Sequence, residues 1–174
     1  MEFSIRPAVV GDASRLGAVH VSAWQWAYRG LMPDDLLDSL RPESRGRAWE
    51  AWLGDPSEHG FEAWVVEVDG EIVGFVSSSD ARDGDVPPNS AELLSVYLLE
   101  PYLGAGLGHA LLTEAEASWR AADYELAVLW VLESNERTRR FYERHGWTTD
   151  GSTKAHDLGA GQEDAAIRYT KILN

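Results

Sequence analysis

The sequence contains no cysteine, and that absence alone excludes several kinds of site. A chain without thiols has no disulfide scaffold, no thiolate zinc site and no cysteine nucleophile. It also has no run of roughly 18 apolar residues that would cross a membrane. The segment from Met1 to Arg6 lacks the basic start and apolar run of a signal peptide, so we expect a cytoplasmic protein. A length of 174 residues suits one domain, residues 1–174, that buries its own core.

Basic residues are also scarce, with 15 Lys and Arg against 29 Asp and Glu and a net charge of −14. A nucleic-acid-binding protein needs a basic footprint, so we expect no nucleic-acid partner. The acids are concentrated between residues 55 and 100, where Arg82 is the only basic residue. This concentration is typical of a solvated acidic face that aids solubility. The alternative is an acidic entrance that attracts a cationic substrate, such as an amine.

The chain alternates between strand and helix patterns, without a repeat or a linker. Hydrophobic patterning predicts strands at residues 3–7, 62–68, 71–77, 91–99, 125–132, 147–149 and 165–173. The pair Asp69-Gly70 predicts a tight hairpin between two of these strands. Helices are predicted to start near residues 12, 33 and 43 and to cover residues 106–122 and 135–145. This order indicates a single mixed α/β domain with strands paired both ways.

Three glycines at alternate positions, Gly104, Gly106 and Gly108, separate a predicted central strand from a helix. Glycine lets the backbone approach a ligand because no Cβ intervenes, and a helix N-terminus offers free N–H groups. Together these features favour a phosphate site, although a turn that only allows tight packing fits them too. A P-loop is excluded because His109-Ala110 replace its Lys-Ser/Thr pair, and the dinucleotide pattern fails because His109 stands at its last glycine.

Two motifs resemble those of the GCN5-related N-acetyltransferase (GNAT) family. The family's pyrophosphate loop reads Arg/Gln-x-x-Gly-x-Gly/Ala, and residues 103–108 match both glycines but carry Leu103 at the first position. The family's Asn-x-x-Ala-x-x-Phe-Tyr-x-x-x-Gly-Phe motif is similar to residues 135–147, with Thr138 and Trp147 replacing Ala and Phe. The motifs occur in the family's order, so together they are more specific than either one. The resemblance covers nearly the whole chain.

The resemblance implies a fold, a reaction and a cofactor site. The fold would be a GNAT fold, with a central mixed, mostly antiparallel sheet of about six to seven strands, flanked by helices and splayed between the fourth and fifth strands. The reaction would be transfer of the acetyl group of acetyl-CoA to a primary amine of a small molecule, a peptide N-terminus or a lysine. The residues implied in acetyl-CoA binding are Tyr97, Leu98, Leu99, Gly104, Ala105, Gly106, Leu107, Gly108, His109 and Asn135. Asn135 is also suited to a plain helix N-cap.

Acyl transfer to an amine needs a neutral amine, a donor to the developing oxyanion and a proton for the departing thiolate. By resemblance Tyr142 is the acid; the alternative is a core aromatic whose hydroxyl is hydrogen-bonded. Glu92 is our candidate for the base, acting through a water, against the alternative of an exposed residue at the start of a strand. Glu133 is a second, weaker candidate for the base.

Trp24 and Tyr28 are candidates for lining the acceptor pocket, because aromatic rings beside acids suit a cationic amine. The histidines show no metal-ligand spacing, so no metal is expected. Homodimers are common in the family, so a homodimer is compatible with the resemblance. The alternative function is a non-catalytic module that binds acyl-CoA or regulates through it.

Overall fold

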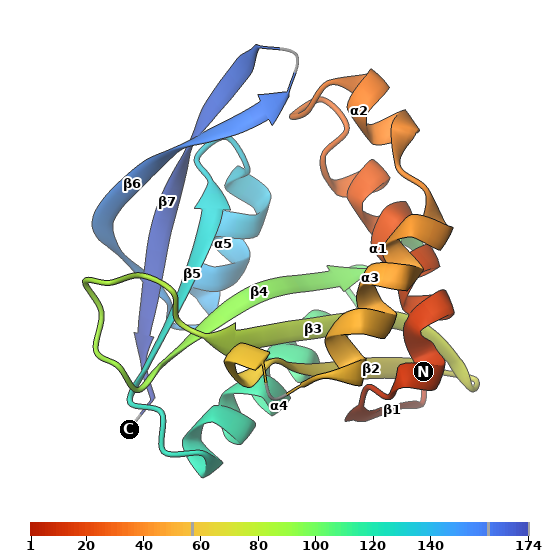
Figure 1. The fold of residues 1–174 in the computed structure, drawn as a ribbon, viewed down its shortest axis with the longest axis horizontal. Helices are drawn as coiled ribbons and strands as arrows, with labels where there is room; N and C mark the ends of the chain where they lie inside the picture. The colour runs from red at the N-terminus through yellow and green to blue at the C-terminus, as the bar shows by residue number, and fades with distance from the viewer. Residues whose placement is uncertain (57, 160, 174) are drawn as a thin grey trace.

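The computed structural model describes residues 1–56, 58–159 and 161–173 (Figure 1). The helical elements are η1 (Val10–Asp12), α1 (Ala13–Ala27), α2 (Asp34–Ser39), α3 (Pro42–Gly54), η2 (Glu58–Gly60), η3 (Glu100–Tyr102), α4 (Leu107–Ala121) and α5 (Glu136–Arg144). The strands are β1 (Phe3–Pro7), β2 (Glu62–Val68), β3 (Glu71–Asp80), β4 (Ser90–Leu98), β5 (Leu126–Leu132), β6 (Thr148–Gly159) and β7 (Gln162–Ile172).

All seven strands form one sheet in the order β1-β2-β3-β4-β5-β7-β6. Every neighbouring pair is antiparallel except β4 and β5, which run parallel. These two strands pair only where Ser90–Leu93 meets Leu126–Leu129, and beyond that point they diverge in Figure 1. The expected mixed sheet, splayed between its fourth and fifth strands, is therefore confirmed.

Helices cover both faces of the sheet. On one face, α1 packs against α3 and against β3 and β4, with Leu16, Trp49 and Phe75 fully buried between them. On the other face, α4 packs on β2, β3 and β4, and it buries Leu111 and Trp119 on one stripe. Within the described residues no helix is both long and apolar enough to cross a membrane.

Of two hairpins in the sheet, one agrees with the prediction from the sequence and the other differs from it. The predicted turn between β2 and β3 is confirmed, since Asp69 and Gly70 both have positive φ, 52° and 79°. The predicted strand at 147–149 was too short, because β6 runs from Thr148 to Gly159. As the sheet's edge strand β6 is exposed almost throughout, so its residues lack the apolar alternation that marks a half-buried strand. Ladder hydrogen bonds to β7 hold it in place.

Candidate functional site

A cavity of about 690 Å³ opens where β4 and β5 diverge. Its walls come from α1, β4, β5, α5 and β6, together with the loop before β4. Most of the residues predicted from the sequence line it: Trp24, Tyr28, Glu92, Tyr97, Leu98, Gly104, Gly106, Gly108, His109, Asn135 and Tyr142. The splay of the sheet thus gathers residues that are far apart in the sequence.

Three of the predicted cofactor residues do not line the cavity. Leu107 is the first residue of α4, and its side chain is buried in the core. The Leu99 side chain also packs against the core, and its N–H donates to the Val73 carbonyl at 2.9 Å. Ala105 is exposed on the turn. Any contact of Leu107 with a ligand must therefore come from its backbone.

The glycine turn combines open space with free backbone donors. Gly104 and Gly106 have φ of 78° and 84°, and no heavy atom lies within 4 Å of the position of a Cβ on either. Gly106 is the N-cap of α4, so the N–H groups of residues 107–109 have no acceptor within the helix. A Cβ on Gly108 would lie 3.5 Å from Leu98 Cδ1, an ordinary van der Waals distance, so packing does not require a glycine at this position. The open space at Gly104 and Gly106 therefore favours the interpretation of the turn as a phosphate site.

Cationic and imidazole side chains from two helices line the cavity close to the turn. His109, at the start of α4, stacks on His145 with ring centroids 4.6 Å apart, and Arg144 lies beside His145 in the lining. His145 Nδ1 is 2.6 Å from the Phe141 carbonyl oxygen. Sequence patterns missed Arg144 and His145, because only the packing of α5 beside α4 brings them to the turn. Positive charge beside free N–H groups favours an anion such as a phosphate.

The edge of β4 that faces the cavity is unpaired beyond Leu93. On one side β4 pairs with β3 as far as Leu98, but among the described strands its β5 side has no partner after Leu93. A register shift opposite Ser77 and Ser78 leaves Leu94 out of the ladder, as a bulge. The backbone donors and acceptors within residues 94–98 that point away from β3 are thus available to a ligand that carries amides.

Three phenols gather in the middle of the cavity. The hydroxyls of Tyr28 and Tyr97 are 2.9 Å apart, and burial raises the pKa of both. Tyr142 is only 7% exposed, and burial, followed by the nearby Tyr28, raises its pKa above the ordinary value. Among the described residues its hydroxyl has no hydrogen-bond partner. Tyr142 is therefore a protonated donor at neutral pH, free to serve a ligand.

Asn135 stands where β5 passes into α5. Its Oδ1 accepts from the Thr138 N–H at 3.2 Å, so the predicted helix cap is confirmed. The residue also lines the cavity, and its amide NH₂ is left to donate to a ligand.

Glu92 is buried rather than exposed, with 7% of its side chain accessible. Its two carboxylate oxygens accept from Arg82, from Nε at 3.0 Å and from Nη2 at 2.8 Å. The other carboxylate candidate, Glu133, is exposed and does not line the cavity. If Glu92 acts as the base, it therefore does so while it is paired with Arg82.

The tryptophans of the lining already carry cations of the chain itself. Arg45 lies 5.9 Å from the ring centroid of Trp24, Arg137 lies 4.3 Å from that of Trp26, and Lys154 Nζ lies 3.9 Å from that of Trp130. The aromatic wall anticipated from Trp24 and Tyr28 is present. Its tryptophan rings, however, are engaged in cation–π contacts within the protein.

The lining is cationic although the chain is acidic. Among the described residues, its Lys and Arg side chains are Arg82, Arg137, Arg144 and Lys154, and its one carboxylate is Glu92. Within the part of the chain that the structure describes, no other acid of residues 55–100 is in this lining. Asp80 accepts from Tyr124, and Asp83 and Asp85 bind Arg168.

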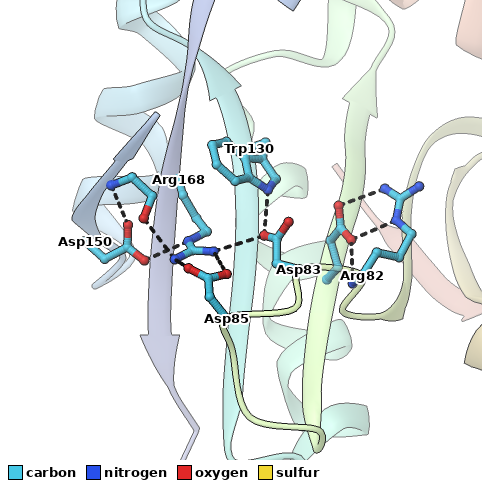
Figure 2. Close-up of polar contacts among 8 residues, drawn as sticks. Arg82, Asp83, Asp85, Trp130, Asp150 and Arg168 are labelled. Carbon is cyan, nitrogen blue, oxygen red and sulfur yellow. Dashed lines mark hydrogen bonds and ion pairs between the residues drawn. The ribbon is translucent and has the colours of Figure 1, made fainter. Parts of the chain in front are cut away.

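Arg168 ties the loop before β4 to the far strands, as Figure 2 shows. Its guanidinium donates to Asp85 at 2.7 Å, to Asp83 at 3.3 Å and to Asp150 of β6 at 2.7 Å. Asp83 also accepts from the Trp130 indole N–H at 2.9 Å. Arg168 is buried, with 7% of its side chain accessible, and it lowers the pKa of Asp85. The sequence offered no signal for this cluster, since its members are far apart in the chain.

Known proteins resemble the chain over most of its length. Residues 21–147 match the family described as the Acetyltransferase (GNAT) family. An uncharacterized N-acetyltransferase of Mycobacterium bovis is 37% identical over 165 residues, which cover 93% of this chain and 99% of that relative. A spermidine N(1)-acetyltransferase of Thermoplasma acidophilum is 26% identical over 157 residues, 87% of this chain and 94% of the relative.

Solved structures share the fold. An N-acetyltransferase from Thermoplasma acidophilum, crystallised in complex with coenzyme A, has a TM-score of 0.74 at 22% identity, covering 97% of this chain and 98% of that one. A ribosomal-protein-alanine N-acetyltransferase from Brucella melitensis has a TM-score of 0.76 at 24% identity, covering 97% and 99%.

Proposed function

Because this chain belongs to the GNAT family of acetyltransferases, we propose that it transfers the acetyl group of acetyl-CoA to a primary amine in the cavity between β4 and β5. The observation that carries the proposal is that three parts of the site lie along one continuous cavity. The glycine turn, the unpaired edge of β4 and Tyr142 all lie along one cavity. An anion site, an amide-binding edge and a proton donor therefore follow one another where a long thioester would run.

Acetyl-CoA fits the donors and the space of this cavity. Its pyrophosphate suits the open glycines Gly104 and Gly106 and the free N–H groups at the start of α4. The amides of its pantetheine arm suit the unpaired backbone of residues 94–98. The free NH₂ of Asn135 is placed to bond the same arm. Leu103 leaves these backbone donors unchanged, since they belong to other residues.

The reaction we propose is direct. Acetyl-CoA supplies an activated acyl group, and the neutral amine attacks its carbonyl carbon, so that a C–N bond forms and the C–S bond breaks. The chain has no cysteine to form an acyl-thiol intermediate. Tyr142 gives its proton to the departing thiolate, because its buried phenol is held in the protonated form.

The amine must lose a proton before or during attack, because a free amine is largely protonated at neutral pH. Glu92 is our candidate to take that proton through a water molecule. The bidentate contact with Arg82 holds the Glu92 carboxylate in one position. We place the acceptor beside Trp24 and Tyr28, which line the α1 side of the cavity. A homodimer stays a prediction from the family.

The test is release of free thiol from acetyl-CoA by the purified chain, with a panel of small amines, amino acids and peptides. We expect thiol release that depends on an amine. Tight CoA binding with no release for any amine would contradict the proposal and favour the non-catalytic, acyl-CoA-binding module.

A further inference from the structure

The end of the cavity that lies away from the glycine turn has its own cations. Glu92 precedes Leu98 by six residues, so at about 3.3 Å per residue the Arg82–Glu92 pair lies about 20 Å from the end of β4 that leads to the turn. Lys154 of β6 lines this part of the cavity together with Arg82. These cations are therefore too distant to serve the phosphate site at the turn.

Lys154 is an ammonium without an anion. Its Nζ lies over Trp130, and among the described residues it has neither a carboxylate nor a hydrogen-bond acceptor. His156 also lines the cavity and is two residues away, on the same face of β6. Its cross-strand neighbour is Asp164, whose carboxylate accepts from Ser134. Of Lys154, His156 and Asp164, Lys154 is thus the charged residue without a partner of opposite charge among the described residues.

The position of Lys154 relative to Arg82 is fixed through Trp130. The Trp130 indole donates to Asp83, the residue next to Arg82, and Asp83 is held by Arg168 (Figure 2). Arg168 also lies 5.5 Å from the Trp130 ring centroid. Lys154 and Arg168 already contact this ring, so it does not offer a free face for a cation–π contact with the acceptor.

Arg82 has donors left over after it binds Glu92. Its Nε and Nη2 are used by the carboxylate, whereas its Nη1 makes no hydrogen bond among the described residues. A guanidinium with a free edge and an unpaired ammonium form a pair of donors suited to a second carboxylate.

We infer that the acceptor is an amine that also carries a carboxylate, as an amino acid does, and that Lys154 and Arg82 bind this carboxylate. The inference rests on the proposed function and adds a substrate class to it. The carboxylate lies at the β6 end of the cavity, and the amine points along β4 toward Tyr142. A polyamine would meet the same cations without a group to pair with them.

The experiment compares acceptors in pairs that differ only in the carboxylate. Thiol release is measured with amino acids, with their C-terminal amides and with spermidine, for the unmodified chain and for Lys154→Met. We expect kcat/KM for an acid to exceed that for its amide by about ten-fold or more, because a charge-assisted contact is lost in the amide. In Lys154→Met this preference falls by about ten-fold, while the dissociation constant of CoA is unchanged.

Arg47→Met is the matched control. Arg47 is exposed on α3 and does not line the cavity, so this variant removes the same charge but keeps the preference for the acid. Equal turnover of acid and amide, preference for spermidine, or a preference that survives in Lys154→Met would overturn the inference and leave the proposed function standing. Failure to release thiol with any amine would overturn both.

Discussion

The two ends of the cavity are built in different ways. The turn end comes mainly from a short continuous segment, residues 103–109, whose glycines and helix start belong to one motif. The β6 end comes from Arg82, Trp130, Lys154 and Arg168, which ion pairs and cation–π contacts bring together from four segments. A site coded locally can be recognised in a sequence, whereas a site assembled through long-range contacts needs the fold.

The two ends also differ in what holds them. The turn depends on backbone conformation, with two glycines at positive φ and open space before them. The β6 end depends on buried charge, because Arg168 and its aspartates fix the loop that carries Arg82. A substitution at one end is therefore expected to leave the other end intact, and this independence can be tested.

Gly106→Trp should have the largest effect and should act on the turn end alone. The indole would fill the open space before the turn, and a side chain at φ of 84° is strained. We expect loss of measurable CoA binding in isothermal titration. Gly30→Trp is the control, because Gly30 has the same φ of 84° and open space but does not line the cavity. If CoA still binds Gly106→Trp, the phosphates do not lie at this turn.

Arg168→Met should weaken the β6 end and leave the turn end unchanged. The variant leaves Asp83 and Asp150 without their cation, which is expected to lower the free energy of unfolding by about 3 kcal/mol. The KM of the acceptor should rise, with CoA affinity unaltered. Arg29→Met, which removes an exposed arginine with two aspartate partners, should change stability little. An unaltered acceptor KM in Arg168→Met would show that the loop does not need this anchor.

Tyr142→Phe acts between the two ends. It removes only the proposed proton donor, so kcat should fall by about ten-fold or more, with CoA affinity retained. Tyr102→Phe changes a tyrosine outside the cavity lining and should keep full activity. Unchanged turnover in Tyr142→Phe would remove the acid role from this residue.

Glu92→Gln tests the base with a smaller expected effect. A lost base matters most where the amine is protonated, so activity should fall several-fold below the pKa of the amine and recover above it. The rate is measured against pH with one acceptor, and Glu133→Gln, at an exposed carboxylate outside the cavity, is the control. An equal loss at every pH would indicate a binding or folding role for Glu92.

His20 gives the test with the smallest expected effect. Its ring is buried against Trp49, Phe75 and Tyr97, and the test measures how this burial affects stability. Burial, with the charge of Arg45, lowers the pKa of His20 to about 3, and Trp49 donates to its Nδ1 at 3.2 Å. Between pH 6.5 and 3 the unfolded chain binds a proton at His20 that the folded chain does not. Stability should therefore fall with decreasing pH by about 1.4 kcal/mol per pH unit on this account.

His20→Gln should remove that part of the slope when denaturant unfolding is followed from pH 6 to pH 4. His156→Gln, at an exposed histidine of β6, should keep it. A slope that is the same in His20→Gln would mean that the folded protein accommodates the protonated ring.

The family resemblance predicted the splayed sheet, and most of the predicted site residues line the cavity, because the motifs that carry the resemblance are local in the sequence. Asn135, Tyr142 and Gly106 belong to spaced motifs, and each lines the cavity. The side chain of Leu107 is buried in the core, and the motif gave no signal for this orientation; a cofactor contact through the Leu107 backbone stays a prediction.

Lys154 and Arg168 were not predicted, for two physical reasons. Lys154 lies on β6, an exposed edge strand whose alternation is hidden by polar residues on both faces. Arg168 pairs with aspartates up to 85 residues away in the chain, and ion pairs of that separation leave no periodicity in a sequence. For the same reason, the sequence did not show that Asp83 and Asp85 share a distant arginine.

The central claim, acetyl transfer to an amine in this cavity, is tested most directly by identifying both products of a single turnover. The chain, in excess over acetyl-CoA, is mixed with an amino acid, and free thiol and acetylated amine are measured together, by thiol reagent and by mass spectrometry. The account predicts one N-acetylated amine for each thiol released. Thiol released without an acetylated amine, or acetyl-CoA bound and left intact, would contradict it.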